Sequence, residues 1–221
     1  MKKLFYSILL LACTASLMTP TTMAADTAAT ATKKTKKKQT AKEKREAAKA
    51  KREAAKAKKA AEKAKKEAAS AAEKIQKDFE ATEATTPVGM ALKKMEFIGT
   101  ARPDVTAEFY FVVRSSSTCP HCVKLLPEVQ AAYQEMRATG KVELLYESFD
   151  NSADTAAEHL SKQGATFPAA MRATMGSLPG AAPLLIPPPA AYVVDAQGKR
   201  IASGPLAPVL ADWRKLTVDK Q

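Results

Sequence analysis

Residues 109–122 read Phe-Tyr-Phe-Val-Val-Arg-Ser-Ser-Ser-Thr-Cys-Pro-His-Cys. The first five are aromatic or β-branched, which predicts a buried strand over residues 109–113. Apolar residues then recur at helical spacing from Val123 to Met136, which predicts a helix over residues 119–138. The segment is therefore expected to be a strand, a short polar loop and a helix whose first turn carries Cys119 and Cys122.

A cysteine at the start of a helix is a candidate nucleophile, because the unpaired N–H groups and the helix dipole favour a thiolate there. Cys119 lies at that end, so we predict that it is the attacking thiol. Cys122, one turn further on, is then the resolving thiol that closes an intramolecular disulfide. His121 can donate a hydrogen bond or a positive charge to the Cys119 thiolate, which stabilises the reduced pair and makes the disulfide more oxidising. Pro120 fits a first helical turn, where no backbone donor is needed.

Three functions of this cysteine pair compete. A zinc site needs about four ligands, and the chain offers only His121, His159 and Cys13 besides the pair, so no metal is expected. A purely structural disulfide would not need the strand, loop and helix around it. Redox exchange by the two thiols, with no cofactor, is therefore favoured.

Several motifs resemble those of the thioredoxin fold. Cys119-Pro120-His121-Cys122 resembles its active site, with the Pro-His dipeptide of DsbA-like disulfide oxidants. Residues 163–168 (Gln-Gly-Ala-Thr-Phe-Pro) and 189–198 (Pro-Ala-Ala-Tyr-Val-Val-Asp-Ala-Gln-Gly) resemble passages of TlpA-like thioredoxins. The resemblance covers about residues 100–217. It implies a thioredoxin-like α/β fold, a central mixed sheet flanked by helices, with Pro189 as a cis-proline that faces the cysteines.

Three positions depart from the thioredoxin pattern. Thr118 stands where thioredoxins usually carry Trp before the first cysteine, and Pro188 precedes the expected cis-proline. The strand at residues 109–113 also lacks the buried acid of thioredoxins. These departures concern the redox potential and the choice of partner rather than the fold.

The first segment, residues 1–24, is predicted to be a signal peptide. It has a charged start at Lys2, a short apolar run, and small residues up to Ala24 that fit a cleavage site. Residues 10–13 (Leu-Leu-Ala-Cys) also resemble a bacterial lipobox, in which Cys13 would be lipidated and become the mature N-terminus. The alternative is that Cys13 is discarded with the signal peptide. In both cases the domain is exported to the periplasm or cell envelope, a compartment that suits disulfide chemistry.

Residues 25–40 are predicted to be a basic linker and residues 41–86 a charged helical stalk composed almost wholly of Ala, Lys, Glu and Arg. Alanines from Ala47 to Ala71, followed by Ile75, keep the alternating three- and four-residue spacing of a coiled-coil seam. A buried methyl group contributes only about 0.8 kcal/mol, so a single helix is favoured over an oligomer joined through the stalk. The redox domain is expected over residues 87–221.

Charge is divided unequally between these parts. Residues 26–86 hold 19 Lys and Arg against 10 acidic residues, whereas residues 87–221 hold 14 against 13. An anionic membrane or cell-wall surface is a candidate partner of residues 33–77. The alternative is that these charges only solvate the helix. Nucleic acid is not expected as a partner, because an exported chain rarely meets any.

The rest of the domain is expected to contain a strand at residues 142–149, a helix at 155–163, a long loop at 165–188, a hairpin of strands 192–195 and 200–203, and a closing helix at 208–217. Residues 90–98 fit either a short helix or a strand.

The resulting hypothesis is an exported thiol-disulfide oxidoreductase that acts on client proteins with thiols or disulfides and is recycled by a membrane redox partner. Its direction, as oxidase, reductase or isomerase, stays open. The alternative is a non-catalytic envelope adaptor with the thioredoxin fold, tethered by its basic helix.

Overall fold

The computed structural model describes residues 29–181 and 185–219, with side chains from residue 46 onward apart from residue 47. The described chain falls into two units, which divide between residues 61 and 62. In the described part of the chain, every helix is too short or too polar to cross a membrane.

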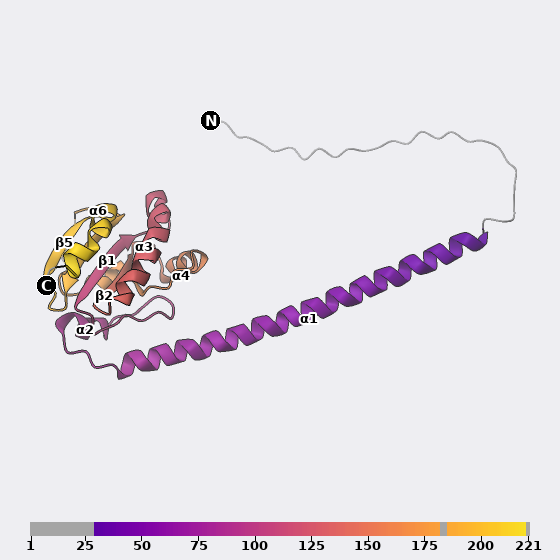
Figure 1. The fold of residues 1–221 in the computed structure, drawn as a ribbon, viewed down its shortest axis with the longest axis horizontal. Helices are drawn as coiled ribbons and strands as arrows, with labels where there is room; N and C mark the ends of the chain where they lie inside the picture. Colours follow the sequence, from indigo (N-terminus) through magenta and orange to yellow (C-terminus); the bar gives the residue numbers. More distant parts are fainter. Residues whose placement is uncertain (1–28, 182–184, 220–221) are drawn as a thin grey trace, which may run out of the picture. The chain divides into compact units, whose positions relative to one another are not determined.

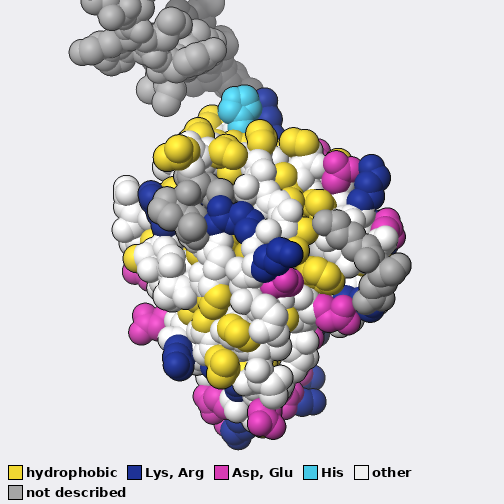
Figure 2. Space-filling view, turned by 90° about the vertical axis from the view of Figure 1, so that its left-hand side faces the viewer, with side chains coloured by type: hydrophobic (Ala, Val, Ile, Leu, Met, Phe, Trp, Pro, Cys, Tyr) yellow, Lys and Arg dark blue, Asp and Glu magenta, His cyan; other side chains and the backbone are white. Residues whose placement is uncertain are grey.

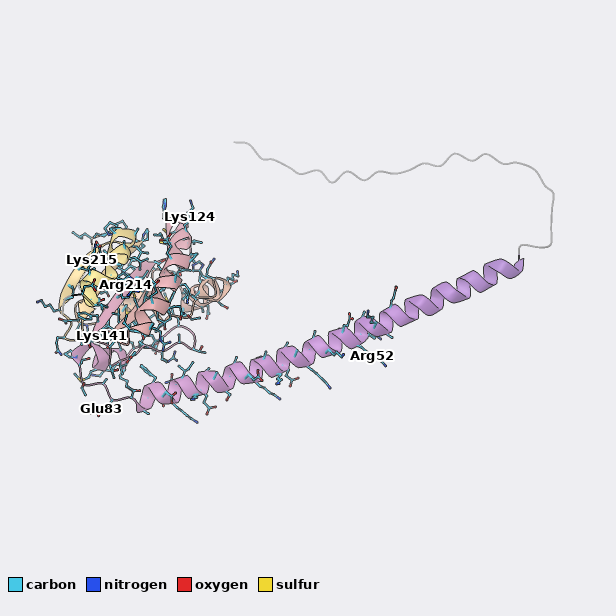
Figure 3. The ribbon with its side chains drawn as sticks, in the orientation of Figure 1. Arg52, Glu83, Lys124, Lys141, Arg214 and Lys215 are labelled. Atoms are coloured by element: carbon cyan, nitrogen blue, oxygen red, sulfur yellow. The ribbon has the colours of Figure 1, made fainter. Side chains whose placement is uncertain are left out.

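The first element is the long helix α1 (Ala29–Ala81), which confirms the predicted charged helix. It begins earlier than predicted, so most of the expected linker is helical. Between residues 48 and 71 the side chains are exposed and project around the whole helix, as Figure 3 shows. Among the side chains that the structure describes, three ion pairs one turn apart, such as Lys77–Glu73 at 2.9 Å, add to the high helix propensity of Ala, Lys and Glu.

The domain that follows is built on one five-stranded mixed sheet in the order β3-β2-β1-β4-β5. Figure 1 labels β1, β2 and β5 of this sheet. The strands are β1 (Phe109–Ser115), β2 (Val142–Ser148), β3 (Ala169–Met171), β4 (Ala190–Asp195) and β5 (Arg200–Pro205). β1, β2 and β3 run parallel, while β4 is antiparallel to both β1 and β5. β1 is therefore the central strand, as its apolar sequence predicts.

Helices bury both faces of this sheet. One face packs against α3 (Pro120–Ala138), α4 (Ala153–Lys162), α6 (Leu206–Ala211) and α7 (Trp213–Thr217), with Trp213 only 5% exposed. The other face packs against α2 (Pro87–Leu92) and α5 (Arg172–Met175). Because alternate residues of a strand point to opposite faces, β1 supplies Phe111 to the first core and Tyr110 to the second.

Two predicted elements differ from the structure. The expected loop at residues 165–188 contains β3 and α5, which are too short to give a periodic signal. β3 forms because its backbone pairs with the end of β2, a contact between distant residues. The expected closing helix is two helices, α6 and α7, separated at Asp212. Residues 90–98, which fit either a helix or a strand by sequence, contain the end of α2 and then a bridge between Ile98 and Ala169.

Candidate active site

Cys119 caps the N-terminus of α3. Its backbone is extended (φ −93°, ψ 110°), and its sulfur accepts a hydrogen bond from the backbone N–H of Cys122 at 3.3 Å. Pro120 is the first helical residue, a position that needs no backbone donor. The sulfur of Cys119 therefore lies where the unpaired N–H groups and the helix dipole stabilise a negative charge.

The two thiols have opposite shifts of the pKa. Burial acts to raise the pKa of the Cys119 thiol, but hydrogen bonds from the Cys122 thiol and from the backbone of Cys122 and His121 outweigh it, and the pKa lies below its ordinary value. Burial raises the pKa of Cys122, and its hydrogen bond to Cys119 adds to this effect. Cys122 is only 2% exposed, whereas Cys119 is partly exposed, and both are free thiols. The lowered pKa favours the thiolate form at Cys119 rather than at Cys122, and Cys122 is shielded from solvent.

His121 is exposed in the first turn of α3. Its contact with the sulfur of Cys119 runs through the backbone N–H. The side chain of His121 is therefore accessible from solvent, two residues after Cys119 in the sequence. In the space-filling view, hydrophobic side chains gather at the upper end of the visible face (Figure 2).

Asp150 holds the loop that carries Cys119. Its Oδ1 atom accepts hydrogen bonds from Ser116 Oγ at 2.9 Å, from Ser117 N at 2.8 Å and from Ser117 Oγ at 2.7 Å. Its Oδ2 atom accepts one from Ser148 Oγ at 3.0 Å. Partial burial acts to raise the pKa of Asp150, but the donors of the serines outweigh it and the pKa is lowered. This carboxylate therefore fixes the residues between β1 and Cys119.

Pro189 lies at the same end of the sheet as this loop. The Pro188–Pro189 peptide bond is cis, as the motif predicts. Ala190, the next residue, pairs with Arg114, which is followed by the last residue of β1. The carbonyl of Pro189 accepts a hydrogen bond from the backbone N–H of Leu206 at 3.1 Å. The register of β1 and β4 thus brings the proline segment and the cysteine loop to one edge of the sheet.

The site contains charged residues that the sequence patterns did not single out. Arg114 in β1 and Glu147 in β2 form a buried ion pair at 3.2 Å, with side chains 7% and 8% exposed. A second buried acid, Glu143, lies near the other end of β2. The domain's buried acids therefore lie on β2 rather than on β1. The available signal was a charged residue inside an otherwise apolar strand. Such a pattern indicates that the charged side chain is buried, but it does not identify the residue with which that side chain pairs. The pairing depends on the register of two strands.

Cys13 lies outside the described residues. Within residues 29–181 and 185–219, no three His, Cys, Asp or Glu side chains lie together in a way that could hold a metal ion.

In this protein, β1 is followed by a short loop that ends at the cysteine pair, at the start of α3. β4 begins directly after a cis-proline at the same end of the sheet. This is a thioredoxin-like fold.

Comparisons with known proteins gave structural matches only. The chain is similar to a thiol:disulfide interchange protein from Bacteroides sp., with 13% identity and a TM-score of 0.42 over 49% of this chain and 72% of that one. It is similar to StoA from Bacillus subtilis, with 16% identity and a TM-score of 0.45 over 55% and 92% of the two chains. An uncharacterized thioredoxin-like protein from Porphyromonas gingivalis matches with 17% identity and a TM-score of 0.43 over 63% and 96%. No protein-family model and no curated protein sequence matches the chain.

Proposed function

We propose that the protein is an exported thiol-disulfide oxidoreductase that exchanges disulfides with client proteins through Cys119 and Cys122. The observation that carries this proposal is the asymmetry of the pair. Cys119 is accessible at the N-terminus of α3 with a lowered pKa, and Cys122 is buried beside it with a raised pKa. Disulfide exchange needs this combination, because the thiolate attacks while the second thiol must wait until a mixed disulfide has formed.

The reaction with a client disulfide takes two steps. The Cys119 thiolate attacks one client sulfur, so the client S–S bond breaks as a Cys119–client S–S bond forms, and the released client thiolate takes up a proton. Cys122 then loses its proton and attacks the Cys119 sulfur, which releases the second client thiol and leaves a Cys119–Cys122 disulfide. Two electrons pass to the client, and an external dithiol partner restores the reduced pair. The same steps run in reverse when a client dithiol is oxidised.

The neighbouring residues have supporting roles in this proposal. The backbone N–H of His121 stabilises the Cys119 thiolate, its imidazole adds a hydrogen bond or a positive charge, and Pro120 sets the first helical turn. Pro189 offers its backbone to an extended client chain. Leu185, which is 99% exposed in the segment before the three prolines, gives that chain an apolar contact.

Trapping a mixed disulfide tests the function. The Cys122→Ser variant retains the attacking thiol but cannot resolve the intermediate, so we expect it to accumulate a covalent adduct with insulin through Cys119. The matched Cys119→Ser variant is expected to form none and to lose insulin reduction. If Cys119→Ser keeps the wild-type rate of insulin reduction, the enzyme proposal fails and the tethered adaptor becomes the better account. Redox titration against glutathione then gives the direction, since a disulfide oxidant has a higher reduction potential than a reductant.

Location and partners are further parts of the proposal. Residues 1–24 direct export to the periplasm or envelope, and lipidation of Cys13 is the alternative to its removal. A membrane redox partner supplies or removes the electrons, and residues 33–77 contact an anionic membrane or wall surface. Export and lipidation are tested by protease accessibility and fractionation of cells that express the full chain, with and without Cys13→Ala.

A further inference from the structure

The segment before β4 contains three consecutive prolines, residues 187–189. Proline has no backbone N–H, so this segment can be fixed by hydrogen bonds only through its carbonyl oxygens. Among the described residues, one anchor lies at the end of the segment, where the carbonyl oxygen of Pro189 accepts a hydrogen bond from Leu206 N at 3.1 Å. Another precedes it at Ile186 O, which accepts from Arg114 Nη1 at 3.2 Å.

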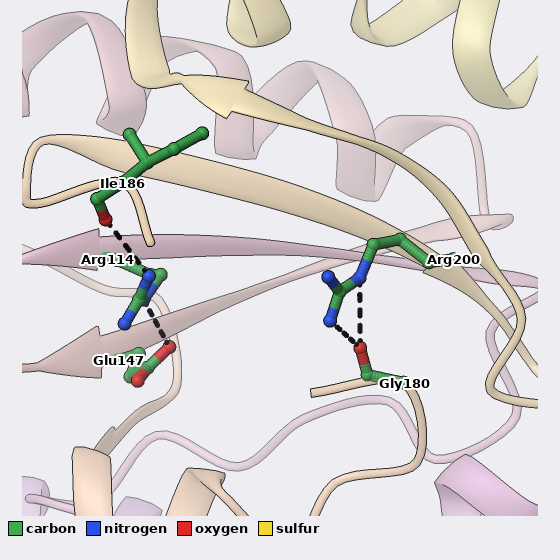
Figure 4. A network of polar contacts seen from close by, with 5 residues as sticks. All are labelled: Arg114, Glu147, Gly180, Ile186 and Arg200. Carbon is green, nitrogen blue, oxygen red and sulfur yellow. Dashed lines mark hydrogen bonds and ion pairs between the residues drawn. The ribbon is translucent and has the colours of Figure 1, made fainter. Parts of the chain in front are cut away.

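Arg114 itself is held firmly. Its Cα pairs with Ala190 on one side and with Glu147 on the other, and its Nε atom lies 3.2 Å from Glu147 Oε2. Its guanidinium also lies over the ring of Phe149, at 4.7 Å from the ring centre. Figure 4 shows the side chain between the Glu147 carboxylate and the Ile186 carbonyl. Arg114 thus contacts both ends of residues 186–190, by its side chain at Ile186 and by its strand at Ala190.

A buried ion pair is a costly way to fill space, because two apolar side chains of similar size often give equal or greater stability. The planar guanidinium has a different advantage, since it can donate to a carboxylate and to a carbonyl in fixed directions at once. Arg114 also lies on the strand that leads to Cys119. It therefore couples the position of the proline segment to that of the cysteine loop.

We propose that Arg114 is a positioning residue for client binding, oriented by Glu147, which holds the Pro188–Pro189 backbone in register with Cys119. This inference rests on the proposed function. It makes a specific claim: the pair serves the approach of a peptide chain, and not the reactivity of the sulfur. Loss of the pair should therefore impair reaction with peptide disulfides while it spares reaction with disulfides that have no backbone.

The test compares two disulfides on full-length reduced protein. One is a short peptide disulfide, and the other is hydroxyethyl disulfide, which has no peptide backbone. In the double variant Arg114→Met/Glu147→Leu, no buried charge is left without a partner, so the domain is expected to fold. We expect its second-order rate constant with the peptide disulfide to fall about tenfold or more, because misplaced contacts cost this much. The rate with hydroxyethyl disulfide should stay within about twofold.

Two further variants separate a loss of client positioning from a loss of folding. Arg114→Lys retains a cation beside Glu147 but not the fork that reaches Ile186, so it should show the same selective loss even if the double variant unfolds. Arg200→Gln is the matched control. Arg200 donates a hydrogen bond from Nε to the carbonyl of Gly180 at 3.1 Å. Gly180 lies in the same segment between α5 and β4, but further from Pro189 in sequence. It should keep both rates within about twofold.

Three results would overturn the inference. They are an unchanged peptide rate in both Arg114 variants, an equal loss with both disulfides, and the same selective loss in Arg200→Gln. A wild-type protein that reacts with neither disulfide refutes the proposed function itself, which separates the two failures.

Discussion

At the scale of single residues, Asp150 is the clearest case of a side chain whose role follows from its contacts. It accepts three hydrogen bonds from Ser116 and Ser117 in the loop before Cys119. Its lowered pKa means that the folded state favours the carboxylate. This contribution to stability is present above the unfolded pKa of about 3.9, and it is lost as the pH falls through the lower folded pKa.

We therefore expect Asp150→Asn to lower the free energy of unfolding at pH 7. Hydrogen bonds to charged groups contribute about 1.5–3 kcal/mol, and partial exposure of the carboxylate reduces the expected loss to about 1–2 kcal/mol. Urea unfolding at about pH 7 and about pH 3 measures it, and the difference from wild type should shrink at the lower pH. Asp154→Asn, an exposed acid in the first turn of α4, is the control. A loss of equal size in both variants, or one that grows on acidification, contradicts the role given to Asp150.

Glu143 has the opposite dependence on pH. It is 2% exposed, and its two oxygens accept the backbone N–H groups of Asp104 at 2.7 Å and Leu144 at 3.0 Å. Burial raises the pKa of Glu143 to about 7, although the N–H donors and Arg137 act in the other direction, while Asp104 adds to the rise. Because the folded pKa is raised, stability is full below the unfolded pKa of about 4.3 and is lost as the pH rises through about 7.

The expected loss of stability between these two pH values is about 3–4 kcal/mol, because the unfolded pKa of about 4.3 and the folded pKa of about 7 differ by about 2.7 at 1.36 kcal/mol for each pH unit. We expect Glu143→Gln to remove this part of the loss of stability between about pH 4 and pH 8. Guanidinium unfolding at several pH values measures the difference, with Glu128→Gln on the exposed side of α3 as the control. An unchanged pH dependence in Glu143→Gln would mean that the pKa of Glu143 is the same in the folded and unfolded states, which contradicts the raised pKa.

At the scale of elements, the end of α1 packs against the segment that follows α2. The rings of Phe79 and Phe97 meet edge to face at 6.0 Å, and Lys93 Nζ lies 4.8 Å above the Phe79 ring. Lys93 also donates hydrogen bonds to the carbonyls of Phe79 and Glu80, which have no further helical partner. Arg102 Nε donates to Gln76 Oε1 at 2.7 Å. Lys93 thus caps the last turn of α1, and Arg102 adds a hydrogen bond to a side chain of the preceding turn.

Phe79→Ala should lower the free energy of unfolding of the domain by about 1–3 kcal/mol, since it removes a partly buried ring and its aromatic contact. Thermal unfolding followed by near-UV circular dichroism, which detects aromatic packing, measures this. Lys77→Ala, two residues away and exposed, is expected to change it by no more than about 0.5 kcal/mol. If the two variants behave alike, the end of α1 contributes nothing to the domain.

The elements also show how far sequence patterns reach. β1 and α3 could be predicted because one is continuously apolar and the other keeps a helical period after a cysteine cap. β3 could not, since three residues give no period and its pairing with Tyr146–Ser148 is a tertiary contact. The cysteine pair and the cis-proline were visible as motifs. Asp150 and the Arg114–Glu147 pair were not, because their partners lie more than thirty residues away in sequence.

At the scale of the whole molecule, the positive charge is concentrated in the first part of α1. Residues 29–61 hold 14 Lys and Arg against 3 acidic residues, whereas residues 62–81 hold 5 of each. Each Lys or Arg near an anionic surface contributes about 1 kcal/mol, and salt screens the attraction. The sequence of α1 consists mainly of Ala, Lys, Glu and Arg, so we expect any binding to be electrostatic.

We expect the chain from residue 25 onward to bind vesicles that contain phosphatidylglycerol at about 50 mM salt and to leave them at about 500 mM. A chain that starts at residue 62 should not bind, and neither chain should bind neutral phosphatidylcholine vesicles. Co-sedimentation measures all four cases. Binding that is independent of lipid charge, or equal for the two chains, would mean that the charges serve only to solvate the helix.

The proposed exchange requires that the pKa of the Cys119 thiol lies below its ordinary value and that Cys122 is protected from solvent. The most direct measurement is the rate of alkylation of each thiol by iodoacetamide across pH, with the labelled residue assigned by mass spectrometry. We expect Cys119 to be labelled first, with a pKa below the ordinary value of about 8.5, and Cys122 to be labelled only when the domain unfolds. Equal labelling of the two thiols, or a Cys119 pKa at or above the ordinary value, would contradict the account.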